Sequence, residues 1–357
     1  MSEARDYKYV GQRTIRPDGF DKVTGRANYA ADFSLPGMLW GKILRSPYAH
    51  ARIKGIDTSK AEALPGVLSV ATHADFHKAE GNLEAGESTM DVRDLSRNIL
   101  ADDKVLYHGH AVAAVAATSP AIARRAAELV EVEYQVLKPV MSVADATKKS
   151  APILHKGMRT ANVQPEPKKD SNIASRAEFR LGNAEDAFKK ADVIIEREYS
   201  TQTVHQGYIE PHACVASISA DGMATIWCSS QGQFMVRAFT AKFCGLDTAK
   251  VKVIPAEIGG GFGGKTVIYL EPLAVMLAKQ AGRAVKMVMT RDEVMRATGP
   301  TSGGIARCKL GAKKDGTLVA GDLELKYEAG AFAGSPVGLG CMTGFAPYNM
   351  KDITCVG

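Results

Sequence analysis

The stretch IGGGFGGK (258–265) is the most informative segment of this 357-residue sequence. Five of the six residues 259–264 are glycine. A glycine within a regular element costs roughly 0.5–1 kcal/mol relative to alanine, because it loses more conformational freedom on folding. We therefore expect the backbone here to adopt dihedral angles that other residues avoid, or to approach another group closely. Successive backbone N–H groups in such a loop can face an anion.

Two nucleotide-binding motifs fit this loop formally. Gly259, Gly261 and Gly264 match G-x-G-x-x-G, the fingerprint of Rossmann dinucleotide sites. The run 259–266, GGGFGGKT, matches the phosphate loop G-x-x-x-x-G-K-T. Against these readings, Pro255 interrupts the preceding apolar run, and no convincing acidic magnesium-binding strand follows. A nucleotide-binding enzyme and a glycine-rich turn without a ligand both stay open as alternatives.

The composition is typical of a soluble globular chain of two or three domains. Forty-five basic and 39 acidic residues give a formal net charge of +6, and 45% of residues are apolar. The densest basic runs are lysine pairs (148–149, 168–169 and 313–314), which we interpret as solvated surface, so no nucleic-acid partner is expected. The sequence has no run of 18 apolar residues and no apolar core near its N-terminus. We therefore expect neither a membrane span nor a secretion signal.

The six cysteines do not form a metal-binding pattern. None is arranged as C-x-x-C, and none has zinc or iron–sulfur spacing with a neighbouring histidine or cysteine. Most lie in apolar runs, so we expect buried free thiols in a reducing, cytoplasmic compartment. The cysteines are Cys214, Cys228, Cys244, Cys308, Cys341 and Cys355.

The N-terminal part of the chain predicts alternating strands and turns. Residues 20–57 are typical of β-structure with turns, and 64–72 of a turn and a strand. The polar stretch 73–98 is expected to be an irregular excursion. Residues 104–137 predict a strand–helix–strand unit, in which Ser119 caps a helix that begins at a proline.

The C-terminal part follows a loop-like stretch, 141–177, in which we place a boundary near 160–175. The linker sequence VQPEPKKDSN is rich in proline and polar residues. Lys314-Asp315-Gly316 predicts a hairpin turn between two alternating runs. Helices are expected over 183–191, 233–245 and 266–282, and strands over 193–202, 223–231, 250–258, 284–290 and 352–357.

Several ordered segments together resemble the molybdenum hydroxylases of the xanthine oxidase and aldehyde oxidase type. The glycine loop and the upstream run SSQGQF (229–234) match that family's pattern, including the spacing from Gln231 to Phe262. Three segments resemble its N-terminal hammerhead domain, namely 21–33, 45–67 and 107–134. Two more resemble the entry to its molybdopterin-binding domain, namely 183–199 and 207–216. The resemblance implies an α/β (α+β) fold. An a/b hammerhead domain is expected over 1–165, followed over 166–357 by the first part of a molybdopterin-binding domain that is incomplete at its C-terminus.

The resemblance also implies roles for residues around the loop. Gln231 would donate a hydrogen bond to a molybdenum oxo ligand, and a neutral amide suits that task. In the family, one stretch of backbone passes beside the cofactor. The corresponding residues here are Gly260, Gly261, Phe262, Gly263 and Gly264. Gln231 and Phe262 would lie near molybdenum without ligating it.

Phe262 and Thr266 are expected to line the substrate pocket. Thr266 stands where purine-oxidising members carry a glutamate, which disfavours a purine substrate. The family's general-base glutamate has no matching position in this sequence. A separate polar trio consists of His205, Glu210 and His212. Glu210 and His212 would share one face if this segment is a strand. We interpret the trio as scaffold rather than as a metal site.

The implied activity is hydroxylation of an aldehyde or of an aromatic or heteroaromatic carbon, with water as the oxygen source. The cofactor would be molybdopterin with molybdenum, with the cytosine dinucleotide form as one option. A [2Fe–2S] iron–sulfur subunit, an FAD-containing flavin subunit, and a second molybdopterin-binding chain or the missing C-terminal half are the implied partners. A reductive member acting on an aromatic acyl-CoA thioester, similar to 4-hydroxybenzoyl-CoA reductase, is the alternative within the family.

Overall fold

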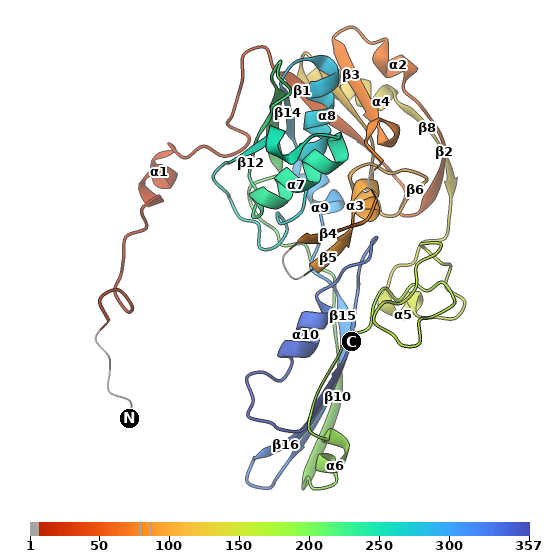
Figure 1. Cartoon of the computed structure of the whole chain (residues 1–357), viewed down its shortest axis with the longest axis vertical. Helices are drawn as coiled ribbons and strands as arrows, with labels where there is room; N and C mark the ends of the chain where they lie inside the picture. The colour runs from red at the N-terminus through yellow and green to blue at the C-terminus, as the bar shows by residue number, and fades with distance from the viewer. Residues whose placement is uncertain (1–6, 79, 86–87) are drawn as a thin grey trace.

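A seven-stranded mixed sheet forms the centre of the molecule. The computed structural model describes residues 7–78, 80–85 and 88–357. In Figure 1 the sheet and its helices make up the upper body. The strands, in their order across the sheet, are β13 (Val251–Pro255), β12 (Ala224–Cys228), β11 (Ala213–Ile218), β14 (Val285–Val288), β1 (Leu39–Arg45), β7 (Ala111–Ala117) and β3 (Val67–Thr72).

The sheet joins strands from distant parts of the chain. Strand β1 pairs in parallel with β14, with Leu39 opposite Val285, and antiparallel with β7 on its other side. Strands from both sides of residue 165 therefore share one sheet. The mixed α/β class predicted from the sequence is confirmed, whereas the division at 165/166 stays a prediction.

Strand β7 shows that the sheet is covered on both faces. Its sequence, AVAAVAA, is buried at every position, as expected for a strand between two helical layers. Ala113, Val115 and Ala117 belong to the core that contains helix α4 (Pro120–Leu129). The predicted cap is confirmed, since the Ser119 hydroxyl accepts the backbone N–H of Ile122 at 3.2 Å. Helix α2 (Ser59–Glu62) lies in the same layer.

Helices α7 (Gln233–Cys244) and α8 (Glu271–Ala281) cover the other face. Residues 271–278 of α8 are all buried, so this helix is central to the core. It ends at Gly282, whose φ of +62° is a left-handed C-cap, as predicted. Its start is five residues later than predicted. The carboxylate of Glu271 accepts the N–H groups of Tyr269 and Leu270 and so begins the helix there.

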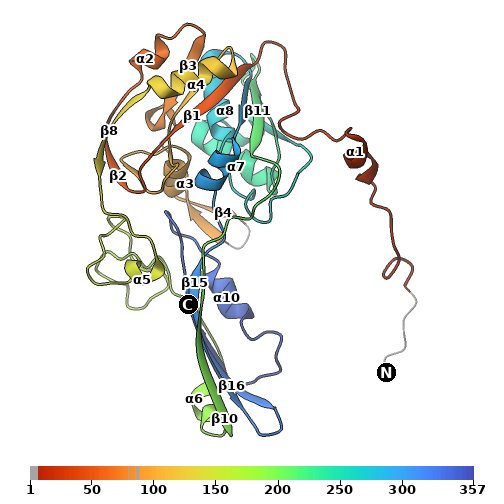
Figure 2. The same ribbon diagram turned by 180° about the vertical axis from the view of Figure 1, so that it is seen from behind.

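A five-stranded sheet projects from this body, as Figures 1 and 2 show. Its hairpin, β15 (Gly304–Ala312) and β16 (Leu318–Tyr327), turns at the predicted Lys314-Asp315-Gly316. Helices α6 (Ala184–Phe188) and α10 (Val337–Thr343) contact it. Its other strands are β10 (Val193–Thr201), β17 (Ile353–Val356) and β9 (Glu178–Leu181).

Two small sheets account for the remaining strands. In one, β2 (Ala51–Asp57) pairs with both β6 and β8, so the strand–helix–strand unit ends in a different sheet from the one that holds β7. The partners of β2 are β6 (Lys104–Val105) and β8 (Glu131–Val136). The other small sheet consists of β4 (Asn82–Ala85) and β5 (Ser88–Asp91). The short elements α5 (Val143–Ala146), η1 (His73–Asp75) and η2 (Thr248–Lys250) lie in connections.

Two local predictions were wrong. Residues 25–33 were expected to include a strand, but α1 (Gly19–Thr24) is followed by irregular chain with a single bridge, Tyr29 to Glu257. The excursion 73–98, of which residues 79, 86 and 87 lie outside the described part of the chain, is more regular than its composition suggested. It contains helix α3 (Val92–Ile99), which begins where the Asp91 carboxylate accepts the N–H of Arg93.

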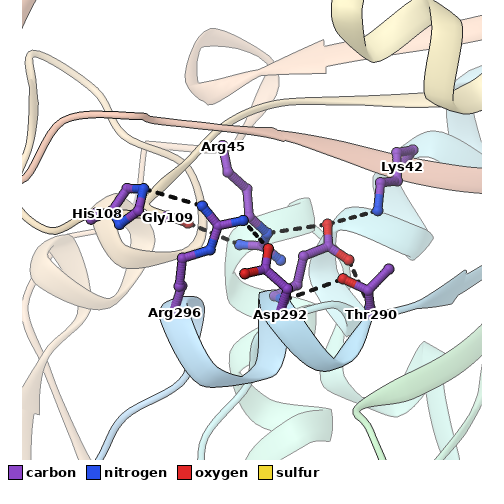
Figure 3. Close-up of polar contacts among 8 residues, drawn as sticks. Lys42, Arg45, His108, Gly109, Thr290, Asp292 and Arg296 are labelled. Carbon is purple, nitrogen blue, oxygen red and sulfur yellow. Dashed lines mark hydrogen bonds and ion pairs between the residues drawn. The ribbon is translucent and has the colours of Figure 1, made fainter.

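A buried ion pair ties β1 to helix α9 (Arg291–Ala297) across the seam between β1 and β14. The Glu293 carboxylate lies 2.8 Å from Lys42 Nζ and 3.4 Å from Arg45 Nε, and its side chain is 9% exposed. Figure 3 shows Lys42 and Arg45 approaching α9 from β1. Burial opposes ionisation, but the Lys42 ammonium, the Thr290 N–H and Arg45 outweigh it and hold the pKa of Glu293 below its usual value.

The cysteines are free thiols, as predicted, and all except Cys308 are buried. Burial raises the pKa of the Cys244 thiol to about 12, so this thiol is inert at neutral pH. Among the described residues, no helix combines the length and apolar character needed to cross a bilayer.

Candidate functional site

The glycine loop runs between β13 and α8 in an irregular path. Gly260 and Gly263 have φ angles of +95° and +90°, which side chains rarely tolerate. Phe262 has a φ of +50°, and its side chain is 73% exposed. A bulky residue held in the left-handed region with its ring in solvent is a strained feature of the kind that clusters at functional sites.

The other three glycines allow the loop to lie directly against neighbouring side chains. A Cβ on Gly259 would be 2.5 Å from the Cβ of Glu210. One on Gly261 would be 2.5 Å from Gln231 Oε1, and one on Gly264 would be 2.7 Å from a Tyr208 ring carbon. The sequence predicted either unusual dihedral angles or a close approach to another group, and the loop shows both.

Gln231 and the loop are joined by hydrogen bonds. Gln231 lies between β12 and α7, and its Oε1 accepts the backbone N–H groups of Gly263 at 3.0 Å and Lys265 at 3.2 Å. Its own N–H donates to the carbonyl of Lys265 at 2.9 Å. These bonds fix which end of the amide is oxygen. Among the described residues Nε2 makes no hydrogen bond, so its two N–H groups are available to an outside acceptor.

Beneath the loop lies a buried ion pair that the sequence did not reveal. Lys265 Nζ lies 2.7 Å from Glu210 Oε2, with the lysine side chain fully buried and the glutamate 9% exposed. The same oxygen accepts the N–H of Gly259 at 2.7 Å. Burial lowers the pKa of Lys265, and the Glu210 carboxylate opposes that shift.

The side chains of the predicted trio, His205, Glu210 and His212, do not converge on one point. Glu210 turns to Lys265, whereas His212 Nε2 meets the Tyr208 hydroxyl at 2.7 Å. His205 Nε2 lies 2.8 Å from the Thr298 hydroxyl. Burial, aided by the charge of Lys265, lowers the pKa of His212 to about 3, so this ring is neutral. Glu210 and His212 also precede β11 rather than lying within it.

In the described part of the chain, no cluster of three His, Cys, Asp or Glu side chains has a geometry that could hold a metal ion. The network around His212 is consistent with the scaffold interpretation, because its hydroxyl and imidazole groups bond to one another.

The nucleotide-binding alternatives lose their structural basis. In both motifs the glycine loop opens directly into a helix, whose N-terminus faces the phosphates. Here α8 begins only at Glu271, after a further irregular segment. The phosphate-loop lysine would have to reach a ligand, yet Lys265 is buried against Glu210. The Thr266 hydroxyl donates to the Gly263 carbonyl at 2.8 Å, within the loop.

Comparison with known proteins identifies the family. Residues 165–357 match the family described as "Molybdopterin cofactor-binding domain", and residues 24–138 match "Aldehyde oxidase and xanthine dehydrogenase, a/b hammerhead domain". The chain belongs to the molybdopterin-binding large subunits of the xanthine dehydrogenase and aldehyde oxidase family, a family of molybdenum-dependent oxidoreductases.

Two relatives illustrate the range of this family. The nicotinate dehydrogenase large molybdopterin subunit of Eubacterium barkeri is 33% identical over 329 residues, which cover 92% of this chain and 72% of the relative. The carbon monoxide dehydrogenase large chain of Afipia carboxidovorans is 36% identical over 328 residues, covering 90% and 40%.

Solved structures agree on the fold. The aldehyde oxidoreductase of Desulfovibrio gigas superposes with a TM-score of 0.82 at 29% identity, covering 96% of this chain and 37% of that one. Quinoline 2-oxidoreductase of Pseudomonas putida gives 0.79 at 27% identity, covering 97% and 44%. The chain thus spans less than half of these two structures, and the activity of the whole protein is a matter for proposal.

Proposed function

We propose that this chain holds a molybdopterin cofactor with molybdenum through Gln231 and the loop residues Gly260, Gly261, Phe262, Gly263 and Gly264. The whole enzyme would hydroxylate an aldehyde or an aromatic or heteroaromatic carbon using water. The observation that carries this proposal is the orientation of the Gln231 amide. Two loop N–H groups hold its oxygen, and its nitrogen is therefore left as a donor.

The residues present fit such a group. An oxo ligand is an acceptor only, and Gln231 Nε2 offers donors without adding charge. An added Cβ on Gly263 would meet no atom of the described residues within 4 Å, so the backbone on that side of the loop has room for a ligand. When bound, the cofactor would supply the two-electron oxidation and reduction chemistry that this chain's side chains lack.

Phe262 and Thr266 are proposed to shape the substrate pocket. The exposed Phe262 ring offers an apolar surface suited to an aldehyde or an aromatic ring. Thr266 is neutral, and its hydroxyl hydrogen is engaged by the loop, which does not favour a purine substrate. The general-base glutamate is proposed to lie outside this chain.

The proposed partners follow from the family. We propose an iron–sulfur subunit with [2Fe–2S] clusters, a flavin subunit with FAD, and a second molybdopterin-binding chain or a C-terminal half. The cytosine dinucleotide form of the pterin is one option within this proposal. The words "large molybdopterin subunit" and "large chain" in the names of relatives support a multi-subunit assembly. The proposed division of this chain is 1–165 and 166–357.

The first test is metal analysis of the purified complex together with a matched pair of variants. About one molybdenum per protomer is expected, and active enzyme without molybdenum would refute the proposal. Gln231→Ala should lower turnover about 100-fold, as loss of a single positioned donor does elsewhere. Gln233→Ala is the control, because this neighbouring glutamine donates instead to the Ser230 carbonyl at 2.8 Å.

A substrate panel then separates the family's activities. Aldehydes, N-heterocycles and aromatic acyl-CoA thioesters would be tested with an artificial electron acceptor and, separately, an artificial donor. Oxidation of an aldehyde or a ring carbon supports the proposed activity. Reduction of the thioester alone would replace it with the reductive alternative.

A further inference from the structure

We propose that the buried ion pair between Glu210 and Lys265 is the positioning element of this site, holding both ends of the glycine loop and, through Lys265, the Gln231 amide. The inference rests on the proposed function for the identity of the bound cofactor. Its structural part, the placing of the loop, stands on contacts within the chain. Neither residue is proposed to touch substrate or cofactor.

One carboxylate oxygen joins the beginning and the end of the loop. Glu210 Oε2 accepts the N–H of Gly259 and the ammonium of Lys265, each at 2.7 Å. Five residues lie between these two points. Because the two contacts share a single acceptor atom, they set the distance across the base of the loop.

Lys265 transmits this position to Gln231 through its backbone. Its N–H donates to Gln231 Oε1 at 3.2 Å, and its carbonyl accepts from the Gln231 N–H at 2.9 Å. The Ser230 hydroxyl donates to the same carbonyl at 3.3 Å. A displacement of Lys265 would therefore move the Gln231 segment with it.

The burial of the pair indicates a role in position rather than in stability. Lys265 is fully buried, and its ammonium lies 5.0 Å from the centre of the Tyr208 ring. Glu210 Oε1 is buried and has no hydrogen-bond partner within the described part of the chain. Removing two charges from water costs free energy that their attraction often only offsets. An apolar pair of similar size would fill this space at no such cost, but it could not accept the Gly259 N–H.

The chain provides a matched control in Glu293. Its carboxylate is also 9% exposed and also lies 2.8 Å from a lysine ammonium, that of Lys42, but at the seam with β1 shown in Figure 3. None of its hydrogen bonds reaches the glycine loop or Gln231. In Glu210→Gln and in Glu293→Gln a buried cation loses the carboxylate charge that faces it. Both substitutions should therefore lower the free energy of unfolding.

The experiment compares wild-type holoenzyme with Glu210→Gln, with the apolar double variant Glu210→Leu/Lys265→Met, and with Glu293→Gln. Hydrogen–deuterium exchange is measured for peptides covering 256–267 and for the rest of the chain. Pterin and molybdenum retained after gel filtration, kcat per bound molybdenum, KM and Tm are measured in parallel. The double variant removes both charges, so it should recover thermal stability while the loop still lacks its tether.

We expect exchange in 256–267 to be at least tenfold faster in Glu210→Gln and in the double variant, and unchanged in Glu293→Gln. Cofactor retention and kcat per molybdenum should fall in the first two, with KM changed less than kcat. Wild-type-like loop exchange in Glu210→Gln would overturn the inference, as would full recovery of loop exchange and retention in the double variant. Wild-type enzyme without molybdenum would refute the proposed cofactor, while loop exchange would still decide the positioning role.

Discussion

Replacing Gly261 with alanine should displace Gln231 without unfolding the loop. The backbone of Gly261 is outside the left-handed region, so alanine introduces no conformational strain there. The new Cβ would lie 2.5 Å from Gln231 Oε1 and 2.8 Å from its Cδ. Because these atoms are the end of a flexible and exposed side chain, the side chain will move aside and the backbone will stay.

The magnitude follows from the bonds that this movement breaks. Gln231 would lose its contacts with the N–H groups of Gly263 and Lys265, at about 1 kcal/mol each. Replacing glycine by alanine returns roughly 0.4–1 kcal/mol by restricting the unfolded chain. The net cost of about 1 kcal/mol should lower Tm by no more than about 2 °C. Turnover should fall about 100-fold, since the donor is no longer in place.

The assay is kcat per bound molybdenum for Gly261→Ala, Gln231→Ala and the double variant, with an aldehyde and an artificial electron acceptor. If the glycine acts only by leaving room for the glutamine, the double variant should be no worse than Gln231→Ala alone. Retention of kcat within threefold of wild type in Gly261→Ala would refute this reasoning. A loss of kcat in the double variant equal to the product of the two single losses would also refute it.

Three further perturbations test other parts of the structure. Gly263→Ala has space for its Cβ but a φ of +90°, so unfolding experiments should show a loss of about 1–2 kcal/mol from strain alone, and no loss would contradict that conformation. Glu293→Gln should cost about 3 kcal/mol in urea titrations at pH 7, because Arg45 keeps its buried charge and Lys42 its half-buried one. Since the pKa of Glu293 is lowered on folding, its contribution is complete above the ordinary carboxyl pKa. It disappears as the pH falls through the lower folded value, so wild type and variant should converge in acid. Ser119→Ala should lower stability by about 1 kcal/mol through loss of the α4 cap, and an unchanged Tm would argue against that cap.

Much of the fold could be predicted because its signals are local. The Ser119 cap, the hairpin turn at 314–316 and the left-handed end of α8 at Gly282 each depend on a few adjacent residues. The apolar run of β7 predicted the first strand of the strand–helix–strand unit. The placement of β8 in a separate sheet could not be predicted, since alternation indicates a strand but not its partner.

The site divides in the same way. Glycine density predicted an unusual loop path, which the angles at Gly260 and Gly263 confirm. The roles of Gln231 and Phe262 stay predictions, although the amide orientation supports the first. The ion pair between Glu210 and Lys265 was missed because the two residues are 55 positions apart. A lysine beside glycines also suggests a solvent-facing or phosphate-binding side chain, and only tertiary contacts reveal its burial.

The sharing of the central sheet by both halves of the chain has a consequence for how the protein is made. Strand β1 finds its partner β14 only after the ribosome has passed residue 288. Until then the nascent N-terminal third exposes an unpaired strand edge, a hazard for aggregation that a holding chaperone would relieve. Once assembled, the same pairing should keep the molecule together after a protease cuts the connection at 141–177. Two polypeptides encoded on either side of that cut could then reassemble by strand complementation.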